Sequence, residues 1–321
     1  MLTVLLATRN RADILRNVLE AYCRLEAPSG GWKLVVADNG STDATSKVIT
    51  AFASRLPLSS VYEPRLGKNS ALNAGLELIE GDLTVLTDDD AFPHEDWLVQ
   101  LRKAADEQSA YAMFGGVVVP RWETPPPAWT QWIDLGPVFT ITPTSMREGE
   151  LTSVTMVQGP NMAIRASLFQ TGLRFDSSIG PCGSSYPMGS ETEILLRLGR
   201  QGYRAWHVRN AVVEHWVRSE QLSKAWVLRR ATRYGRGWYR MAPAKKLWMG
   251  VPRHLLREVP RALLRMSAAT VLHRPDVVMN SRWRLNYLLG EAIEARNIAR
   301  EATIGAEPSV LQSGPQPWRR S

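Results

Sequence analysis

The chain has 321 residues, of which 44% are hydrophobic and 22% charged, and it contains two cysteines. This composition excludes an intrinsically disordered chain, a coiled coil and a disulfide-rich secreted fold, and it predicts one large domain or two small ones in a reducing compartment. The formal net charge of +8 is uneven: residues 218–321 carry 20 Lys and Arg against 7 Asp and Glu, whereas residues 1–217 carry 19 against 24.

The first 120 residues alternate between short apolar runs and amphipathic stretches. Strands are predicted at 2–8, 33–38, 59–63, 83–87 and 112–119, with helices between them from after a cap at 10–13 to about 25, and at 43–55, 69–80 and 94–107. This order predicts a doubly wound, mostly parallel sheet flanked by helices. The first residues turn polar too early for a signal peptide, and no run of 18 apolar residues predicts a membrane-spanning helix.

Polar residues follow three of the predicted strands. They are Thr8-Arg9-Asn10, Asp38-Asn39-Gly40 and Asp88-Asp89-Asp90. Doubly wound sheets bind ligands at the carboxyl ends of their strands, so a site is expected where these segments meet.

The three consecutive aspartates are the most informative of these segments. In an extended chain Asp88 and Asp90 point to one side and Asp89 to the other. Two carboxylates on one side repel each other unless a cation joins them, and Mg²⁺ or Mn²⁺ prefers such oxygen ligands together with substrate phosphates. The alternative is an acidic turn that caps the next helix.

Two further segments fit a nucleotide ligand. Asp38 could accept hydrogen bonds from a base or a ribose, although the residues after it could equally cap a helix. Lys68 lies at a predicted helix start, where backbone amides favour a diphosphate; otherwise it is a solvated lysine. The chain has no P-loop and no dinucleotide-binding glycine motif.

The second half offers three more candidates. Asn161 follows the turn Gly159-Pro160 and could bind a polar ligand, or it could satisfy only that turn. Glu191 opens a predicted helix and could act as a general base, whereas Glu193 fits a helix-dipole role. His215 follows a short strand and is either structural or a third metal ligand.

Eight segments in order now resemble the family 2 inverting glycosyltransferases, which have the GT-A fold. They span residues 1 to about 240 and read TRNRADILRNVLEAY, VVADNGSTD, GKNSALNAGL, LTVLTDDDAFPHEDWL, GPNMAIRASLF, FDSSIG, GSETEILLRL and VVEHW. The family's pair of acidic residues at the catalytic base reads Ser190-Glu191 here, so the base would be one methylene longer.

The resemblance implies a role for each matching residue. Metal ligands would be Asp90, Asp88 and His215, and Glu191 would be the catalytic base. The nucleotide-sugar donor would contact Thr8, Arg9, Asn10, Asp38, Lys68, Asp88 and Asp89. The acceptor would lie near Asn161. Trp129, which no matching segment contains, is expected to bind the acceptor as part of the tryptophan-rich loop.

The implied reaction needs Mn²⁺ or Mg²⁺. It would move a sugar from a nucleotide-diphosphate sugar, with UDP expected first, to a hydroxyl of a glycan, a lipid-linked molecule or a small molecule, as in polysaccharide or glycolipid synthesis. Two alternatives are a sugar-phosphate nucleotidyltransferase, which should carry a Gly-rich loop after the first strand, and a basic nucleic-acid-binding protein. No nucleic-acid-binding motif accompanies the basic charge, so no nucleic-acid partner is expected.

The tryptophan-rich loop from 120 to 150 is expected to cover the ligand edge, or to fill the core with its tryptophans. The predicted domains are a catalytic domain at 1–217, with a donor half to about 120 and an acceptor half after it, and a basic helical extension at 218–304. A disordered tail is predicted at 305–321.

The basic extension contains an arginine every four residues. Leucines and other apolar residues interleave with Arg253, Arg257, Arg261 and Arg265, and Pro260 would kink or split this helix. The pattern fits a helix on an anionic membrane surface or a basic solvent face. The expected location is therefore the cytoplasm, with peripheral contact to the inner membrane face in the first case.

Overall fold

The apolar runs of the first 120 residues form strands of one sheet in the computed structural model, which describes residues 1–183, 185–244 and 246–305. Within these residues nine strands form the sheet, in the order β3-β2-β1-β4-β8-β6-β9-β5 with β7 beside β9. They are β1 (Leu2–Thr8), β2 (Trp32–Asp38), β3 (Leu58–Tyr62), β4 (Leu83–Asp88), β5 (Ala91–Pro93), β6 (Met113–Trp122), β7 (Gly149–Glu150), β8 (Met162–Arg165) and β9 (Ala205–Val217).

The sheet is mostly parallel, and the predicted fold class is confirmed. Strand β1 pairs in parallel with β2 and β4, which brings Thr8 beside Asp38 and Ala7 beside Asp88. The predicted strand at 112–119 is not the parallel neighbour of β4, because β8 lies antiparallel between β4 and β6. The register nevertheless gathers the carboxyl ends of β1, β2 and β4 at one edge.

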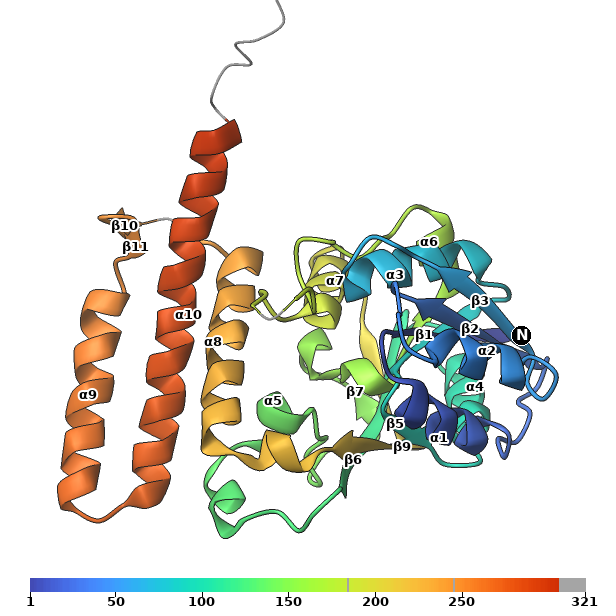
Figure 1. Cartoon of the computed structure of the whole chain (residues 1–321), viewed down its shortest axis with the longest axis horizontal. Helices are drawn as coiled ribbons and strands as arrows, with labels where there is room; N and C mark the ends of the chain where they lie inside the picture. The colour runs from blue at the N-terminus through green and yellow to red at the C-terminus, as the bar shows by residue number, and fades with distance from the viewer. Residues whose placement is uncertain (184, 245, 306–321) are drawn as a thin grey trace, which may run out of the picture.

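Helices cover both faces of this sheet (Figure 1). Side chains alternate along β1, so Leu2, Val4 and Leu6 face one side and Leu5 faces the other. The first side packs against α1 (Ala12–Tyr22), α2 (Thr45–Phe52) and α4 (Trp97–Glu107). The second packs against α3 (Lys68–Gly75), α6 (Ala166–Gln170) and α7 (Ser190–Arg200).

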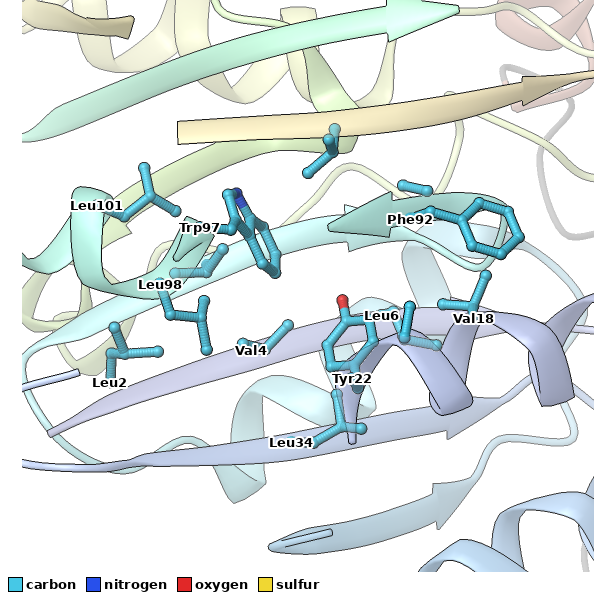
Figure 2. Packing of buried hydrophobic residues seen from close by; sticks show 14 of the residues in the cluster. Leu2, Val4, Leu6, Val18, Tyr22, Leu34, Phe92, Trp97, Leu98 and Leu101 are labelled. Carbon is cyan, nitrogen blue, oxygen red and sulfur yellow. The ribbon is translucent and has the colours of Figure 1, made fainter. Parts of the chain in front are cut away.

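Leucine and valine side chains surround a few aromatic ones in the first core (Figure 2). Trp97 of α4 and Tyr22 of α1 face each other edge to face, with ring centroids 6.1 Å apart at 82°. Both side chains are essentially unexposed. Such ring pairs add to the burial free energy, so α1 and α4 are held firmly against β1 and β4.

The basic C-terminal segment is helical. It contains α8 (Lys224–Met241), a small hairpin of β10 (Leu247–Trp248) and β11 (Val251–Pro252), α9 (Leu255–Val271) and α10 (Pro275–Gly305). Helix α10 packs between α8 and α9 (Figure 1). Pro260 does not split α9, which is assigned as one helix through it.

None of the helices in the described ranges is both long and apolar enough to cross a bilayer. Apart from Gly305 at the end of α10, the predicted tail lies outside the described residues. The remaining helix, α5 (Leu135–Phe139), lies in the loop after β6.

Candidate active site

A cleft of about 1070 Å³ opens at the carboxyl edge of the sheet. Its walls come from the ends of β1 and β4, the start of α3, the loop before α7, the end of β9 and one face of α8. The position follows from topology, because the loops after parallel strands diverge there. Eight of the predicted site residues line it, namely Thr8, Arg9, Lys68, Asp88, Asp89, Asp90, Glu191 and His215.

The three aspartates at the end of β4 have three different partners. Asp88 accepts a hydrogen bond from Lys68 Nζ at 2.5 Å, and Asp89 accepts one from Thr8 Oγ1 at 2.7 Å. Asp90 Oδ1 lies 3.5 Å from His215 Nε2. Asp88 and Asp90 therefore do not form the expected pair on one side of the strand. Asp88 is bound to Lys68, and Asp90 lies beside His215.

Pairing between β5 and β9 places His215 beside Asp90. Ala91 and His215 are partners in this antiparallel pair, and Trp216 N donates to the Asp90 carbonyl at 2.9 Å. The other ring nitrogen of His215, Nδ1, lies 2.8 Å from the Phe139 carbonyl. A carbonyl can only accept, so Nδ1 carries a proton. Asp90 raises the pKa of His215 against the effect of burial, so without a cation the ring is favoured in its charged form, and Nε2 would offer a lone pair to a cation only after losing its own proton.

Asp90 is an unusually acidic carboxyl. Burial by itself would raise its pKa, but the hydrogen bond and charge of His215, with Arg11 close by, hold the pKa well below its usual range. Arg11 Nη1 lies 3.4 Å from the Asp90 Oδ2 atom. The net shift of Asp89 has the opposite direction. Burial and the neighbouring carboxylates raise its pKa to about 6, although Arg11 lowers it. Asp90 therefore stays ionised although it is buried.

The described side chains offer few ligands to a divalent cation. Among the described residues, no group of three or more His, Cys, Asp and Glu side chains is arranged to hold a metal. Asp90 and His215 supply one oxygen and one nitrogen, which suits Mn²⁺ or Mg²⁺ when substrate phosphates and water complete the shell. Asp88 is not part of this pair, because its carboxylate is bound to Lys68.

Lys68 links the end of β4 to the start of α7. Its Nζ donates to Glu191 Oε1 at 2.6 Å as well as to Asp88. Burial alone would raise the pKa of Glu191, but the charge and hydrogen bond of Lys68 outweigh it and lower that pKa. Glu191 therefore stays ionised in the cleft, and Lys68 is itself held charged by the two carboxylates.

A glycine makes room for the Glu191 side chain. A Cβ added at Gly159 would stand 2.9 Å from both Cγ and Cδ of Glu191, closer than such atoms approach. The absence of a side chain at Gly159 therefore leaves the space that the Glu191 side chain occupies. The helix carrying Glu191 is preceded by Gly189, whose φ of 121° favours glycine.

Two predicted donor contacts, Asp38 and Asn10, do not line the cleft. Asp38 is buried and accepts a hydrogen bond from Ser41 N at 2.9 Å, and Asn10 Oδ1 accepts one from Thr42 N at 2.8 Å. Both therefore shape the loops after β1 and β2. Asn39, which the sequence analysis did not select, lines the cleft and accepts a hydrogen bond from Gly67 N at 2.8 Å.

Asn161 does not have the expected acceptor-binding position. Its side chain is fully buried, and it accepts a hydrogen bond from Trp97 Nε1 at 2.8 Å. Its amide donates to the carbonyls of Val117 and Ala211, both at 2.9 Å. With both donors used and no exposure, Asn161 joins β6, β9 and α4 and is not available to a ligand.

Trp129 lies outside the walls of this cleft, and its expected contact with an acceptor stays a prediction. Trp129 packs on a third apolar cluster built around Val138, Phe139 and Val227, and it does not line the cleft. The loop from 120 to 150 thus uses this tryptophan for packing. Other aromatic residues line the cleft instead, namely Tyr186, Trp226, Tyr234 and Trp238.

Helix α8 supplies a wall that the sequence analysis missed. Trp226, Arg230, Arg233, Tyr234 and Trp238 recur at helical spacing and all line the cleft. This spacing could have predicted that the five residues share one face of a helix. The high charge of the same stretch instead suggested a surface role. The wall is tied to its surroundings, since Arg230 Nε donates to the Pro137 carbonyl and Met188 N to the Arg233 carbonyl, both at 3.1 Å.

Comparison with known proteins decides the family. The sequence model described as glycosyl transferase family 2 matches residues 3–173, more than half of the chain. The chain belongs to glycosyl transferase family 2. This membership confirms the resemblance seen in the eight motifs and favours a glycosyltransferase over the nucleotidyltransferase alternative.

Relatives within the family are distant. The probable glycosyltransferase YdaM of Bacillus subtilis is 24% identical over 245 residues, which cover 73% of this chain and 54% of that protein. The validoxylamine A glucosyltransferase of Streptomyces hygroscopicus subsp. jinggangensis is 33% identical over 90 residues, 27% of this chain and 21% of that protein. The chain thus spans about half or less of the length of these curated relatives.

Solved structures share the fold. Mannosyltransferase PcManGT from Pyrobaculum calidifontis, in complex with GDP-Man and Mn²⁺, has a TM-score of 0.57 at 21% identity, covering 94% of this chain and 75% of that one. S. aureus TarS 1-349 in complex with UDP-GlcNAc has a TM-score of 0.52 at 14% identity, covering 94% and 92%. These likenesses support the GT-A architecture.

Proposed function

We propose that the chain transfers a sugar from a nucleotide-diphosphate sugar to an acceptor hydroxyl, with a divalent cation and with inversion at the anomeric carbon. One observation carries this proposal: the Asp90–His215 pair and the ionised Glu191 line the same cleft at the carboxyl edge of the sheet. A cation-binding pair and a separate carboxylate base are what a single direct displacement requires.

The cation would be Mn²⁺ or Mg²⁺, held by Asp90 and by His215 through Nε2. When bound, it would neutralise charge on the donor diphosphate as the leaving group departs. The PcManGT structure with GDP-Man and Mn²⁺ supports a cation of this kind in the family. The remaining steps fall to side chains of this chain.

The donor would lie along the ends of β1, β2 and β4. Arg9, Asn39 and the loop after β1 border the part of the cleft nearest these strands, and Lys68 stands at the start of α3, where backbone amides also favour phosphate. Asp38 and Asn10 would act indirectly by holding the loop backbones. The donor could carry uridine, guanosine or thymidine as its nucleoside, and we expect UDP first.

Glu191 would act as the base. The acceptor hydroxyl would lose its proton to the Glu191 carboxylate, its oxygen would bond to the anomeric carbon, and the bond from that carbon to the diphosphate oxygen would break. Attack and departure on opposite faces give inversion. The wall of α8, with Trp226 and Trp238, would form the acceptor side, because aromatic faces pack well on sugars.

A thermal-shift series tests the class and the donor base together. The wild-type chain would be melted with UDP, GDP or dTDP, each with Mn²⁺ or with EDTA. We expect one nucleotide to raise Tm only with the cation, because a ligand that binds the folded state stabilises it by mass action. Asp90→Ala should lose this rise, and Asp13→Ala, an exposed carboxylate on α1, should keep it.

Two results would contradict the proposal. One is a rise in Tm that is the same in EDTA as in Mn²⁺. The other is a rise in Asp90→Ala equal to that of the wild type.

A further inference from the structure

Exposed apolar side chains are concentrated at one end of the described chain. At the tip of the β10–β11 hairpin Leu247, Trp248 and Met249 are 46%, 51% and 81% exposed. On and just after α9, Leu256, Leu263, Leu264, Val271 and Leu272 are 44–77% exposed. Patches of this kind on a soluble domain mark an interaction site.

Helix α9 has two apolar faces with different surroundings. Leu255, Ala262 and Ala269, seven residues apart, are buried on the side that packs against α10. Leu256, Leu263, Leu264 and Val271 recur at the spacing of the opposite face and point to solvent in the described structure. The sequence pattern did not separate these two faces. Within the described residues, only the face with Leu255 packs against another element, helix α10.

Positive charge borders the outward face. Arg257, Arg261 and Arg265 follow one another at four-residue spacing, and all three are exposed. The stretch from 246 to 274 contains six Lys and Arg but one acidic residue, Glu258. Glu258 is already paired, with Arg261 at 3.3 Å and Arg284 at 3.6 Å. The border is therefore cationic.

We infer that the β10–β11 hairpin and the outward face of α9, together the lipid-facing surface, bind an anionic membrane surface. The leucines and Trp248 would enter the boundary between headgroups and acyl chains while the arginine stems reach up to lipid phosphates. A helix of this length lies flat over about 25 Å, enough for several headgroups. This inference goes beyond the proposed function, since it uses no residue of the cleft.

Charge and chemistry favour lipid over two other occupants. A second copy related by a two-fold axis would bring the same arginine row against itself, which like charges oppose. Nucleic acid would explain the arginines but would leave the exposed leucines and Met249 without a role. An anionic bilayer satisfies both halves of the surface at once. Because α10 joins α9 to α8, the lipid would lie at a fixed distance from the cleft (Figure 1).

Sedimentation with vesicles tests this inference on the full chain without any substrate. Vesicles of phosphatidylcholine alone would be compared with an equal mixture of phosphatidylcholine and phosphatidylglycerol. We expect binding to the mixed vesicles that weakens with salt. The combined variant Arg257→Gln, Arg261→Gln and Arg265→Gln should bind about tenfold more weakly or worse, because each basic residue contributes to attraction by an anionic surface. The matched control changes three exposed arginines elsewhere, Arg147, Arg200 and Arg209, to Gln.

The apolar half is tested separately. Leu263→Ser with Leu264→Ser should also weaken binding, whereas Tyr62→Ser, an exposed aromatic on the catalytic sheet, should not. Brominated lipid should quench the fluorescence of the wild type more than that of Trp248→Phe. All of these side chains are exposed, so the variants should fold.

Three results would overturn the inference. The first is equal binding to neutral and anionic vesicles. The second is binding that none of the surface variants weakens. The third is a dimer by light scattering that the same variants dissociate, which would assign the surface to a second copy.

Discussion

At the scale of single residues, Lys68 controls the ionisation of Glu191, the proposed base. Its ammonium and hydrogen bond lower the pKa of Glu191 against the opposing effect of burial. A base works only when it is ionised, so lowering its pKa extends activity toward acid pH. Lys68→Gln removes the charge while burial remains, and the pKa of Glu191 should then rise. The acid limb of the kcat–pH profile should shift to higher pH.

The pH profile of turnover checks this expectation, with Lys68→Arg as the variant that keeps the charge. Lys68 also contacts Asp88, so donor affinity would be followed separately from kcat. An acid limb at the same pH in the wild type and in Lys68→Gln would show that Lys68 does not control Glu191.

Glu294 joins two helices at the scale of elements. It is fully buried on α10 and accepts hydrogen bonds from Arg236 Nε, at 2.8 Å, and from Arg240 Nε, both on α8. Loss of Glu294 would leave Arg236 without its acidic partner, while Arg240 would keep Glu301. Removing one partner of a buried ion pair typically costs about 3–5 kcal/mol. Glu294→Ala should lower the free energy of unfolding by that order, and Glu294→Gln should lower it less.

Denaturant unfolding measures this loss. Glu20→Ala is the matched control, because Glu20 makes a similar two-contact pair with Arg55 on the exposed surface, where water already solvates both charges. A loss in Glu294→Ala no larger than that in Glu20→Ala would mean that α8 and α10 are held by apolar packing alone.

Some strands and helices could be predicted from the local sequence, and others could not. The strands at 2–8, 33–38 and 83–87 are apolar runs buried on both faces, so local sequence was enough. Strand β8 has four residues, and its place between β4 and β6 is decided by pairing with distant strands. Asn161 looked like a site residue because polar turns often are, but burial and three hydrogen bonds gave it a packing role.

At the scale of the whole molecule, the acidic part at 1–217 and the basic part after it both contribute residues to the cleft. The acidic half contributes the aspartates of β4 and Glu191, and the basic half contributes Arg230 and Arg233 of α8. Burial lowers the pKa of Arg230 to about 10, still charged near neutral pH. The charge asymmetry of the sequence predicted two different roles, yet the structure places part of the basic segment in the cleft wall.

Donor binding and turnover compared in Glu191→Gln test the central claim most directly. The nucleotide sugar selected by the thermal-shift series would be titrated onto the variant, and release of the nucleoside diphosphate would be followed. We expect donor affinity near that of the wild type and turnover lower by about 10²–10⁴, because the carboxylate takes a proton only in the transition state. Glu193→Gln, which loses a pair with Arg197 one turn along α7, should turn over normally. Near-native turnover in Glu191→Gln, or inactivity confined to Glu193→Gln, would contradict the account.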